Sequence, residues 1–267
     1  MTSAVAIDDR AGAGSVPPLS VCMVTNRFDA YFEQAAASIL DQDFADFEFV
    51  IVANGMSDDV FTELSAHLRD PRVRLFRTHV SGICFSRNLA LAHARGEFVA
   101  VMDADDVAEP ARLGTQIAFM RAHPDVGVCG SAYRLIDSEG KARETIVLPQ
   151  DHETIAGSFW RRNALCHPAT VLRRELVARA GGYSGYSAED YELWLRLQEN
   201  PAVRFHNLPD VLLGYRVPVV SLERYSRQAY RHVAAARLRQ FLRTGHPKWL
   251  AGVLLATASL LLRARRA

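Results

Sequence analysis

The stretch that decides the fold is Phe98-Val99-Ala100-Val101-Met102-Asp103-Ala104-Asp105-Asp106. An apolar run of this length, placed directly after Gly96-Glu97, predicts a strand that is buried on both faces. The run ends in three carboxylates, which repel one another unless a cation lies among them. In open α/β sheets, the carboxyl ends of the strands are also where ligands bind. A solvated acidic turn remains the alternative for such a short motif by itself.

Three apolar runs precede this stretch, at residues 20–25, 47–53 and 73–76. Each is followed by a segment with helical periodicity, and Asp29 is placed to cap the first of these helices. Strands that alternate with helices at this spacing predict a parallel sheet with right-handed crossovers.

The pattern continues after the acidic stretch. It predicts a helix after Pro110, a strand at 126–129, an extended piece and then a helix within 145–160, a strand-like run at 167–174, a helix from 187, and a pair of strands within 203–215. We therefore expect an α/β architecture throughout.

Composition excludes several classes of protein. The 267 residues carry 31 Lys and Arg against 30 Asp and Glu, so the formal net charge is +1, which argues against a nucleic-acid partner. The four cysteines are scattered with no C-x-x-C pair, which is typical of reduced core cysteines in a cytosolic protein. No G-x-G-x-x-G follows the first strand and no P-loop is present. A metal held by the acidic strand end is the natural substitute for these phosphate cradles.

Three segments are expected along the chain. Residues 1–18 lack the apolar core of a signal peptide and predict a mobile tail. Residues 19–221 form the main domain, and residues 222–267 form a basic and apolar helical extension. The apolar run at 249–262 is shorter than the roughly 20 residues that span a bilayer. Two alternatives remain open for 224–267. One is a helix that lies in the membrane interface, with the arginines of 224–243 and 263–266 toward anionic lipid, and the other is a helix packed on the domain.

An ordered set of short motifs runs from about residue 20 to residue 221. The motifs are Asp41-Gln42-Asp43-Phe44, Asn54-Gly55, Ser86-Arg87-Asn88, Asp103-Ala104-Asp105-Asp106, His167-Pro168, Gly181-Gly182-Tyr183, Glu189-Asp190, Leu193-Trp194-Leu195-Arg196 and Tyr215-Arg216. Each is weak alone, but in this order and spacing the set resembles the family 2 glycosyltransferases, which are inverting, nucleotide-sugar-dependent enzymes of the GT-A fold. The resemblance implies a Rossmann-like, mostly parallel sheet flanked by helices.

The resemblance also implies roles for the carboxylates. Asp103 would lie at the donor, and Asp105 and Asp106 would hold Mn²⁺ or Mg²⁺ on the donor diphosphate, with Asp105 favoured first. Asp190 matches the catalytic base that takes the proton from the acceptor hydroxyl, a contribution worth roughly 10²–10⁴-fold. A helix N-terminal carboxylate that is stabilised by the helix dipole is the structural alternative for Asp190.

Further residues are carried over as binding residues. Those expected at the donor nucleotide are Thr25, Asn26, Asn54, Arg87 and Arg216. Those expected on the acceptor side are Glu189, His167 and Trp194. The two arginines either pair with the diphosphate or pack as ordinary arginines, and His167 either lines the acceptor site or is structural.

The chain departs from the family pattern at two positions. Asn54 stands where the family has the second Asp of Asp-Asp-Gly-Ser, and Asn26 stands where a stacking Tyr is common. An amide oxygen accepts a hydrogen bond as a carboxylate does, but without the charge, so the base of the donor is left open. These changes keep a non-catalytic nucleotide-sugar-binding relative as an alternative.

The resemblance implies one leading function. It is transfer of a sugar, a hexosyl group by expectation, from a nucleotide diphosphate sugar to a hydroxyl of a lipid-linked or cell-surface glycan. Such polysaccharide biosynthesis would take place in the cytoplasm, at the inner face of the plasma membrane. A nucleotidyltransferase is disfavoured, because no Gly-rich, Lys-containing loop follows the first strand.

Overall fold

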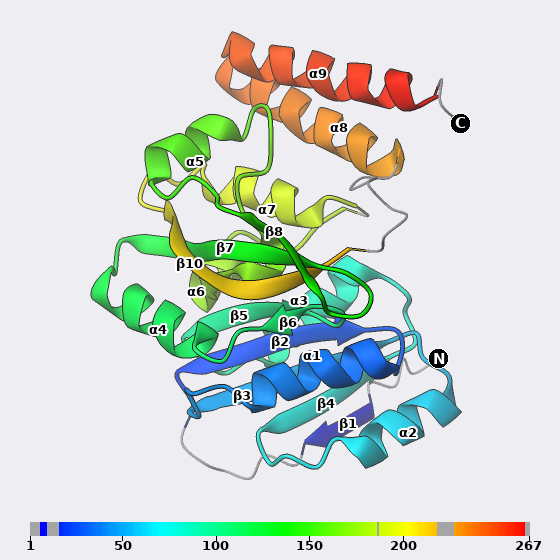
Figure 1. Ribbon diagram of the computed structural model, residues 1–267. Helices are drawn as coiled ribbons and strands as arrows, with labels where there is room; N and C mark the ends of the chain where they lie inside the picture. Colours follow the sequence, from blue (N-terminus) through cyan, green and yellow to red (C-terminus); the bar gives the residue numbers. More distant parts are fainter. Residues whose placement is uncertain (1–5, 10–15, 186, 218–226, 265–267) are drawn as a thin grey trace.

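The computed structural model describes residues 6–9, 16–185, 187–217 and 227–264 of the chain (Figure 1). The strands are β1 (Ala6–Asp9), β2 (Leu19–Thr25), β3 (Phe47–Asn54), β4 (Val73–Thr78), β5 (Phe98–Asp103), β6 (Val107–Ala108), β7 (Val126–Ile136), β8 (Ala142–Ile146), β9 (Val171–Arg173) and β10 (Arg204–Arg216). The helices are α1 (Ala30–Leu40), α2 (Asp58–His67), α3 (Ile83–His93), α4 (Arg112–Ala122), α5 (His152–Ser158), α6 (Arg174–Arg179), α7 (Glu189–Leu197), α8 (Arg227–Thr244) and α9 (Pro247–Ala264). The described strands form one sheet in the order β1-β4-β3-β2-β5-β9-β7-β10-β6, and β8 pairs with β7.

The first half of the sheet is parallel, as the alternation of strands and helices predicts. β4, β3, β2 and β5 lie side by side in the same direction, and Thr25 of β2 is opposite Ala53 of β3. Asp29 caps α1 as expected, because its carboxylate accepts the backbone N–H groups of Tyr31 and Phe32. The carboxyl ends of these strands therefore meet at one edge.

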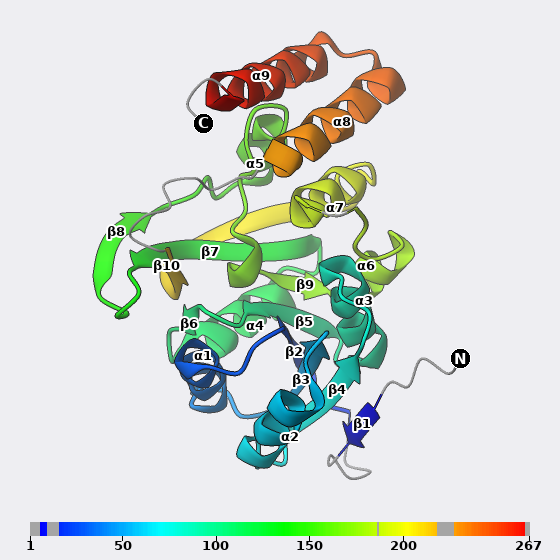
Figure 2. The same cartoon turned by 90° about the vertical axis from the view of Figure 1, so that its right-hand side faces the viewer.

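Both faces of this half are covered by helices, which explains the continuous apolar runs (Figure 2). Met23 of β2 and Ile51 of β3 pack in the core that includes residues of α1 and α4. Cys22 and Val50, one residue earlier on each strand, pack on the other face with Ala90 of α3. Alternate residues thus reach opposite cores.

The second half of the sheet is mixed. β9 lies antiparallel between β5 and β7, whereas β7 and β10 are parallel. The strand-like run predicted at 167–174 is instead a 3₁₀ turn (His167–Ala169) followed by the short β9, because Pro168 suits the start of a helical turn.

The predicted pair of strands at 203–215 is also wrong. A single strand, β10, covers this segment, and its register with β7 shifts between Leu208 and Val211. Pro209 lies in this irregular part, where no ladder N–H is needed, so the proline does not end the strand.

The N-terminal segment differs in part from the predicted tail. Residues 6–9 form β1, which pairs antiparallel with β4 at the edge of the sheet. The rest of the predicted tail up to residue 15 lies outside the described residues.

The C-terminal helices α8 and α9 pack together at one end of the molecule, next to α5 and α7 (Figures 1 and 2). Arg239 pairs with Glu192 of α7 (Nη1 to Oε1, 2.8 Å), and Arg243 pairs with Glu199 (Nη1 to Oε2, 2.5 Å). Two of the arginines that were expected to face lipid, Arg239 and Arg243, thus pair with carboxylates of the enzyme itself, one in α7 and one just after it. Three further arginines of that expectation, Arg224, Arg265 and Arg266, lie outside the described residues. Within the described residues, no helix is long and apolar enough to cross a membrane.

Candidate active site

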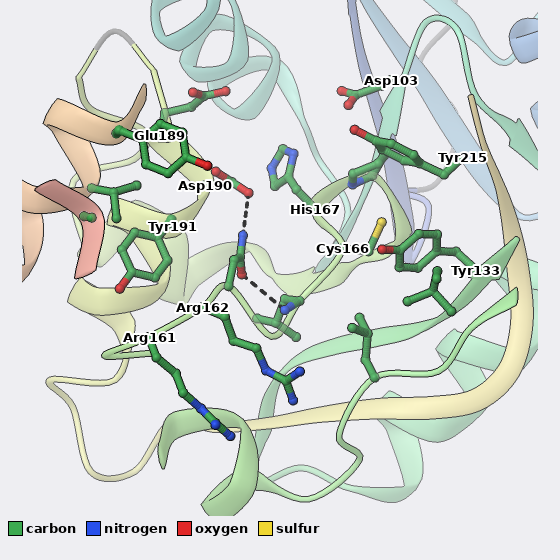
Figure 3. Close-up of a pocket in the computed structure, with 18 of the residues that line it drawn as sticks. Asp103, Tyr133, Arg161, Arg162, Cys166, His167, Glu189, Asp190, Tyr191 and Tyr215 are labelled. Atoms are coloured by element: carbon green, nitrogen blue, oxygen red, sulfur yellow. Dashed lines mark hydrogen bonds between the residues drawn. The ribbon is translucent and has the colours of Figure 1, made fainter. Parts of the chain in front are cut away.

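A cavity of about 580 Å³ lies where the end of β5, the start of α7, the segment 161–168 and α9 come together (Figure 3). Asp103, Glu189 and Asp190 lie on its wall, so the structure brings together the acidic strand end and the predicted base. Asp103 is far in the sequence from Glu189 and Asp190, and they meet because α7 lies beside the carboxyl edge of the sheet.

Asp190 is presented by a strained turn. Ala188, directly before α7, has a φ of 57°, a left-handed conformation that costs a non-glycine residue about 1–2 kcal/mol. Asn163 Nδ2 donates a hydrogen bond to Asp190 Oδ2 (2.9 Å; Figure 3). Burial and the neighbouring charge of Glu189 raise the pKa of Asp190 to about 6. A carboxylate with this pKa is well matched to accept a proton near neutral pH.

Arg87 links Asp103, at the end of β5, to Glu189, at the start of α7. Its guanidinium donates to Asp103 Oδ1 (Nη2, 3.0 Å) and to Glu189, and it lies over the ring of Tyr183. Burial opposes the charge, but Asp103 and Glu189 outweigh it and raise the pKa of Arg87. Arg87, which was predicted to bind the donor, is thus held between two carboxylates.

The three aspartates of the acidic stretch have different surroundings. Asp105 is half-exposed, with Arg27 Nη2 at 3.3 Å from its Oδ2, and burial and Asp103 raise its pKa. Asp106 is 1% exposed, and its Oδ1 accepts the backbone N–H of Arg216 (2.8 Å). Burial and Asp103 raise the pKa of Asp106 well above its usual value. Asp106 therefore fastens the acidic turn to β10.

A divalent cation fits the donor set on chemical grounds. Carboxylate oxygens are the ligands of Mg²⁺ and Mn²⁺, and Asp106 Oδ2 is buried with no hydrogen-bond partner among the described residues. No group of three or more His, Cys, Asp or Glu among the described residues is arranged to hold a metal unaided. Mg²⁺ is usually bound by one or two carboxylates with substrate phosphates as further ligands. The accessible carboxylates, Asp103 and Asp105, suit a site of that kind. Asp106, the other predicted ligand, has a free Oδ2 among the described residues but is only 1% exposed, so its role at the metal stays a prediction.

The predicted nucleotide residues lie at the ends of β2 and β3. Thr25 is buried and its hydroxyl donates to the carbonyl of Arg27 (2.6 Å), whereas Asn26 is exposed. Asn54 Oδ1 accepts the backbone N–H of Gly82 (3.1 Å), which ties β3 to the start of α3. The amide oxygen of Asn54 is therefore already in use, although it has a second lone pair.

All three nitrogens of the Arg216 guanidinium donate hydrogen bonds within the protein. Its Nε donates to the carbonyl of Asp105 (2.7 Å), Nη1 to the carbonyl of Asp137 (2.8 Å), and Nη2 to Gln34 Oε1 (2.8 Å). The guanidinium also lies over the ring of Tyr31, 4.6 Å from its centroid. Of the two alternatives for Arg216, these contacts favour a packing arginine that joins four segments, and a role at the diphosphate stays a prediction.

Of the two further acceptor-side residues, only His167 reaches the cavity. Its Nε2 is 2.8 Å from the Tyr183 hydroxyl, and burial and Arg87 lower its pKa well below the usual value, so it is neutral. Trp194 is fully buried and packs with the ring of His167. Trp194 is a core residue of α7, so its assignment to the acceptor site is wrong.

Several residues of the site carry no motif that would have identified them. Arg27 pairs with Asp105, and Asn163 holds the predicted base. Arg161 and Arg162 also line the cavity. The sequence contains one feature that could have pointed to them. Arg161-Arg162-Asn163 is a polar stretch between the apolar pairs Phe159-Trp160 and Ala164-Leu165.

Comparison with known proteins gives consistent matches. The family model described as "Glycosyl transferase family 2" matches residues 20–181. The chain is 34% identical over 232 residues to the O-antigen biosynthesis glycosyltransferase WbnJ of Escherichia coli, which covers 84% of this chain and 89% of that protein. It is 36% identical over 138 residues to the amylovoran biosynthesis glycosyltransferase AmsE of Erwinia amylovora, which covers 51% of this chain and 50% of that protein.

Solved structures show the same fold at lower identity. S. aureus TarS 1-349 has a TM-score of 0.66 and 22% identity, over 90% of this chain and 72% of that chain. This chain spans 39% of the longer TarS structure. The mannosyltransferase PcManGT of Pyrobaculum calidifontis, solved with GDP-Man and Mn²⁺, has a TM-score of 0.66 and 20% identity, over 94% and 76% of the two chains.

These likenesses establish the GT-A fold. The family model spans more than half of the residues, and WbnJ aligns over most of both chains. The chain therefore belongs to glycosyl transferase family 2 and is a glycosyltransferase.

Proposed function

We propose that this enzyme moves a hexosyl group from a nucleotide diphosphate sugar to a hydroxyl of a glycan acceptor, with inversion, by single displacement. The observation that carries the proposal is Asp190, a carboxylate with a pKa raised to about 6 on the wall of a cavity that also contains Asp103. In a single displacement the base must lie close to the bound donor. Asp103, the carboxylate expected at the donor, shares the cavity with Asp190.

The donor is proposed to lie at the carboxyl edge of the sheet. Its diphosphate would be near Asp103 and Asp105, which would hold Mn²⁺ or Mg²⁺, and its nucleoside near Thr25, Asn26 and Asn54. PcManGT was solved with GDP-Man and Mn²⁺, and TarS 1-349 with UDP-GlcNAc, which supports a nucleotide-sugar donor with a metal. The metal, when bound, neutralises charge on the departing diphosphate.

The acceptor hydroxyl would then approach Asp190. Asn163 occupies Oδ2 of Asp190, which leaves Oδ1 to accept the hydroxyl proton. The acceptor oxygen forms a bond to the anomeric carbon as the bond from that carbon to the diphosphate oxygen breaks. The rings of Tyr133 and Tyr215, whose centroids are 5.7 Å apart on the same wall, offer an apolar surface to a sugar ring.

The acceptor is proposed to be a lipid-linked or cell-surface glycan at the cytoplasmic face of the plasma membrane. WbnJ is named for O-antigen biosynthesis and AmsE for amylovoran biosynthesis. A row of exposed leucines on α9, Leu250, Leu254 and Leu261, gives the C-terminal end an apolar surface that suits peripheral contact with lipid.

A non-catalytic nucleotide-sugar-binding relative is the second candidate, and Asn54 and Asn26 favour it. Against it stands the environment of Asp190. A relative without activity has no need of a buried carboxylate with a pKa near neutrality.

Transfer and donor hydrolysis, measured with a panel of nucleotide sugars that includes UDP-GlcNAc and GDP-mannose, test the proposal. Each donor is assayed with Mn²⁺, with Mg²⁺ and with EDTA. We expect metal-dependent release of nucleoside diphosphate from one donor, lost in Asp190→Asn. Donor binding without release from any member of the panel would favour the non-catalytic relative.

A further inference from the structure

The cavity has two charged ends. Asp103, Glu189 and Asp190 form the acidic end, where the chemistry is placed. Arg161 and Arg162 line the same cavity but lie apart from Asp103, as Figure 3 shows. A cavity with its acidic end at the reaction centre and two guanidinium groups elsewhere suits a substrate that carries negative charge at a distance from its reacting hydroxyl.

The two arginines differ from the other arginines of the cavity. Arg87 is committed to Asp103 and Glu189, and Arg237 donates to the Tyr191 hydroxyl and to the carbonyl of Gly252. For Arg161 and Arg162, by contrast, no ion pair or side-chain hydrogen bond is formed with any residue in the described ranges, and both side chains are exposed. Two adjacent like charges without carboxylate partners repel each other unless an anion joins them.

The backbone that carries this pair is fixed in place. The N–H groups of Arg161 and Arg162 both donate to the carbonyl of Ser158 (2.9 and 3.0 Å), which closes the end of α5. Helix α9 passes so close that a Cβ on Gly252 would lie 2.1 Å from the carbonyl oxygen of Trp160. Because the next residue, Asn163, donates to Asp190, the position of the arginine pair is coupled to that of the base.

We propose that Arg161 and Arg162 bind a phosphate group that is carried by the acceptor, while the acceptor hydroxyl reaches Asp190. This inference rests on the proposed function. Guanidinium groups match the oxygens of phosphate in a fork geometry and bind it with charge-assisted hydrogen bonds. Val233, Leu255 and Ala256 line the same cavity and provide an apolar wall for the part of the acceptor that bears the phosphate.

Isothermal titration calorimetry with hexyl phosphate tests the site directly. EDTA is present, so that metal-dependent binding at the aspartates does not contribute. The wild type is compared with Arg161→Gln/Arg162→Gln, and with Arg121→Gln, which removes an exposed arginine of α4 away from the cavity. We expect the double variant to lose affinity by roughly tenfold or more and Arg121→Gln to retain it.

A second variant, Arg161→Lys/Arg162→Lys, keeps the two positive charges but removes the paired N–H donors of the guanidinium groups. We expect it to bind hexyl phosphate with intermediate affinity. Thermal unfolding checks that each variant is folded. Inorganic phosphate is titrated in a parallel arm: equal affinity means that the phosphate alone is recognised, and tighter binding of hexyl phosphate means that the apolar wall also takes part. Either result supports the site.

The inference is overturned if wild type binds hexyl phosphate no more tightly than the folded Gln double variant at low salt. The proposed function fails separately, if wild-type enzyme with Mn²⁺ releases nucleoside diphosphate from no donor of the panel. An enzyme that hydrolyses its donor but shows no arginine-dependent phosphate binding would therefore reject this site alone.

Discussion

Asp190 is subject to opposing influences that together set its pKa. Burial and Glu189 disfavour its charge, while the N–H of Tyr191 and the guanidinium of Arg87 favour it. The pKa of about 6 means that the carboxylate form predominates only above that pH. The kcat/KM for transfer should therefore fall as the pH drops through about 6, and Asp190→Asn should lose roughly 10²–10⁴-fold in kcat. A pH–rate profile in the range 4.5–8.5 measures the first effect.

Asn163→Ala tests whether Asp190 is the group that titrates in this profile. A hydrogen bond to a carboxylate favours its charged form, so removing the donor at 2.9 Å should raise the pKa of Asp190 further. The acidic limb of the profile should then move to higher pH, with donor affinity little changed. A limb that stays in place in Asn163→Ala would mean that another group titrates.

Asp105 and Asp106 are predicted to respond differently to substitution. Asp105→Ala should abolish Mn²⁺-dependent binding of a nucleoside diphosphate and leave the protein folded, because the side chain is 45% exposed.

Asp106→Ala should destabilise the protein by about 1–3 kcal/mol, because it leaves the buried N–H of Arg216 without its acceptor. Calorimetry with UDP or GDP and urea unfolding measure the two effects. Unchanged affinity in Asp105→Ala would remove that residue from the metal site.

At the residue scale, the sequence was informative where a motif carried the chemistry. Asp103 and Asp190 lie on one cavity, as the resemblance implied. Trp194 was misassigned, and the two alternatives for Arg216 could not be separated, because their partners, the ring of His167 and Gln34, come from distant parts of the chain. No local pattern shows that an arginine is already satisfied.

At the scale of elements, Glu48 of β3 joins the amino-terminal ends of the first strands. Its carboxylate is buried and accepts from Ser20 (2.6 Å), from Arg74 (2.9 Å), and from both the backbone and the side chain of Arg95. Burial alone would raise the pKa of Glu48, but these hydrogen bonds outweigh it and hold the pKa below its usual value.

Glu48→Gln should lower the free energy of unfolding by about 3 kcal/mol at pH 7, because Arg74 and Arg95 lose a buried carboxylate. Since the folded pKa is lowered, the stabilisation is present above the unfolded value near 4.5 and is lost as the pH falls through the folded pKa. The gap between wild type and variant should therefore shrink below about pH 4. Urea unfolding measures it, with Glu97→Gln as an exposed control that should cost less than about 1 kcal/mol. Equal effects of the two substitutions would contradict this account.

Elements were predictable where burial imposed a simple pattern. β2, β3 and β5 are covered on both faces, so continuous apolar runs identified them within a residue or two. β10 was misjudged because its bulge at Pro209 depends on the register with β7. Such a register is set by pairing between strands and leaves little trace in the local sequence.

At the scale of the whole molecule, the C-terminal helices have two surfaces. The inner surface is part of the fold: Trp249 is buried, and Leu255 and Ala256 form part of the cavity wall. The outer surface carries Leu250, Leu254 and Leu261 on one side of α9. The apolar run at 249–262 predicted either a packed helix or an interfacial one. The structure shows packing on the inner side and leaves the outer leucines exposed.

If the outer leucines contact lipid, replacing them should release the protein from membranes without affecting the fold. Leu254 and Leu261 are 65% and 60% exposed, so Leu254→Gln/Leu261→Gln should change the free energy of unfolding little. Burying a leucine in an apolar phase is worth about 1.5–3 kcal/mol. The loss of two leucine side chains should therefore weaken binding to anionic liposomes by more than about tenfold. Val80→Gln, at an exposed apolar position outside the C-terminal helices, should bind as wild type does. Sedimentation with liposomes measures the bound fraction. If wild type does not sediment with them, or the leucine variant sediments equally well, α9 is a packing element of the enzyme and its outer leucines have no part in holding it at the membrane.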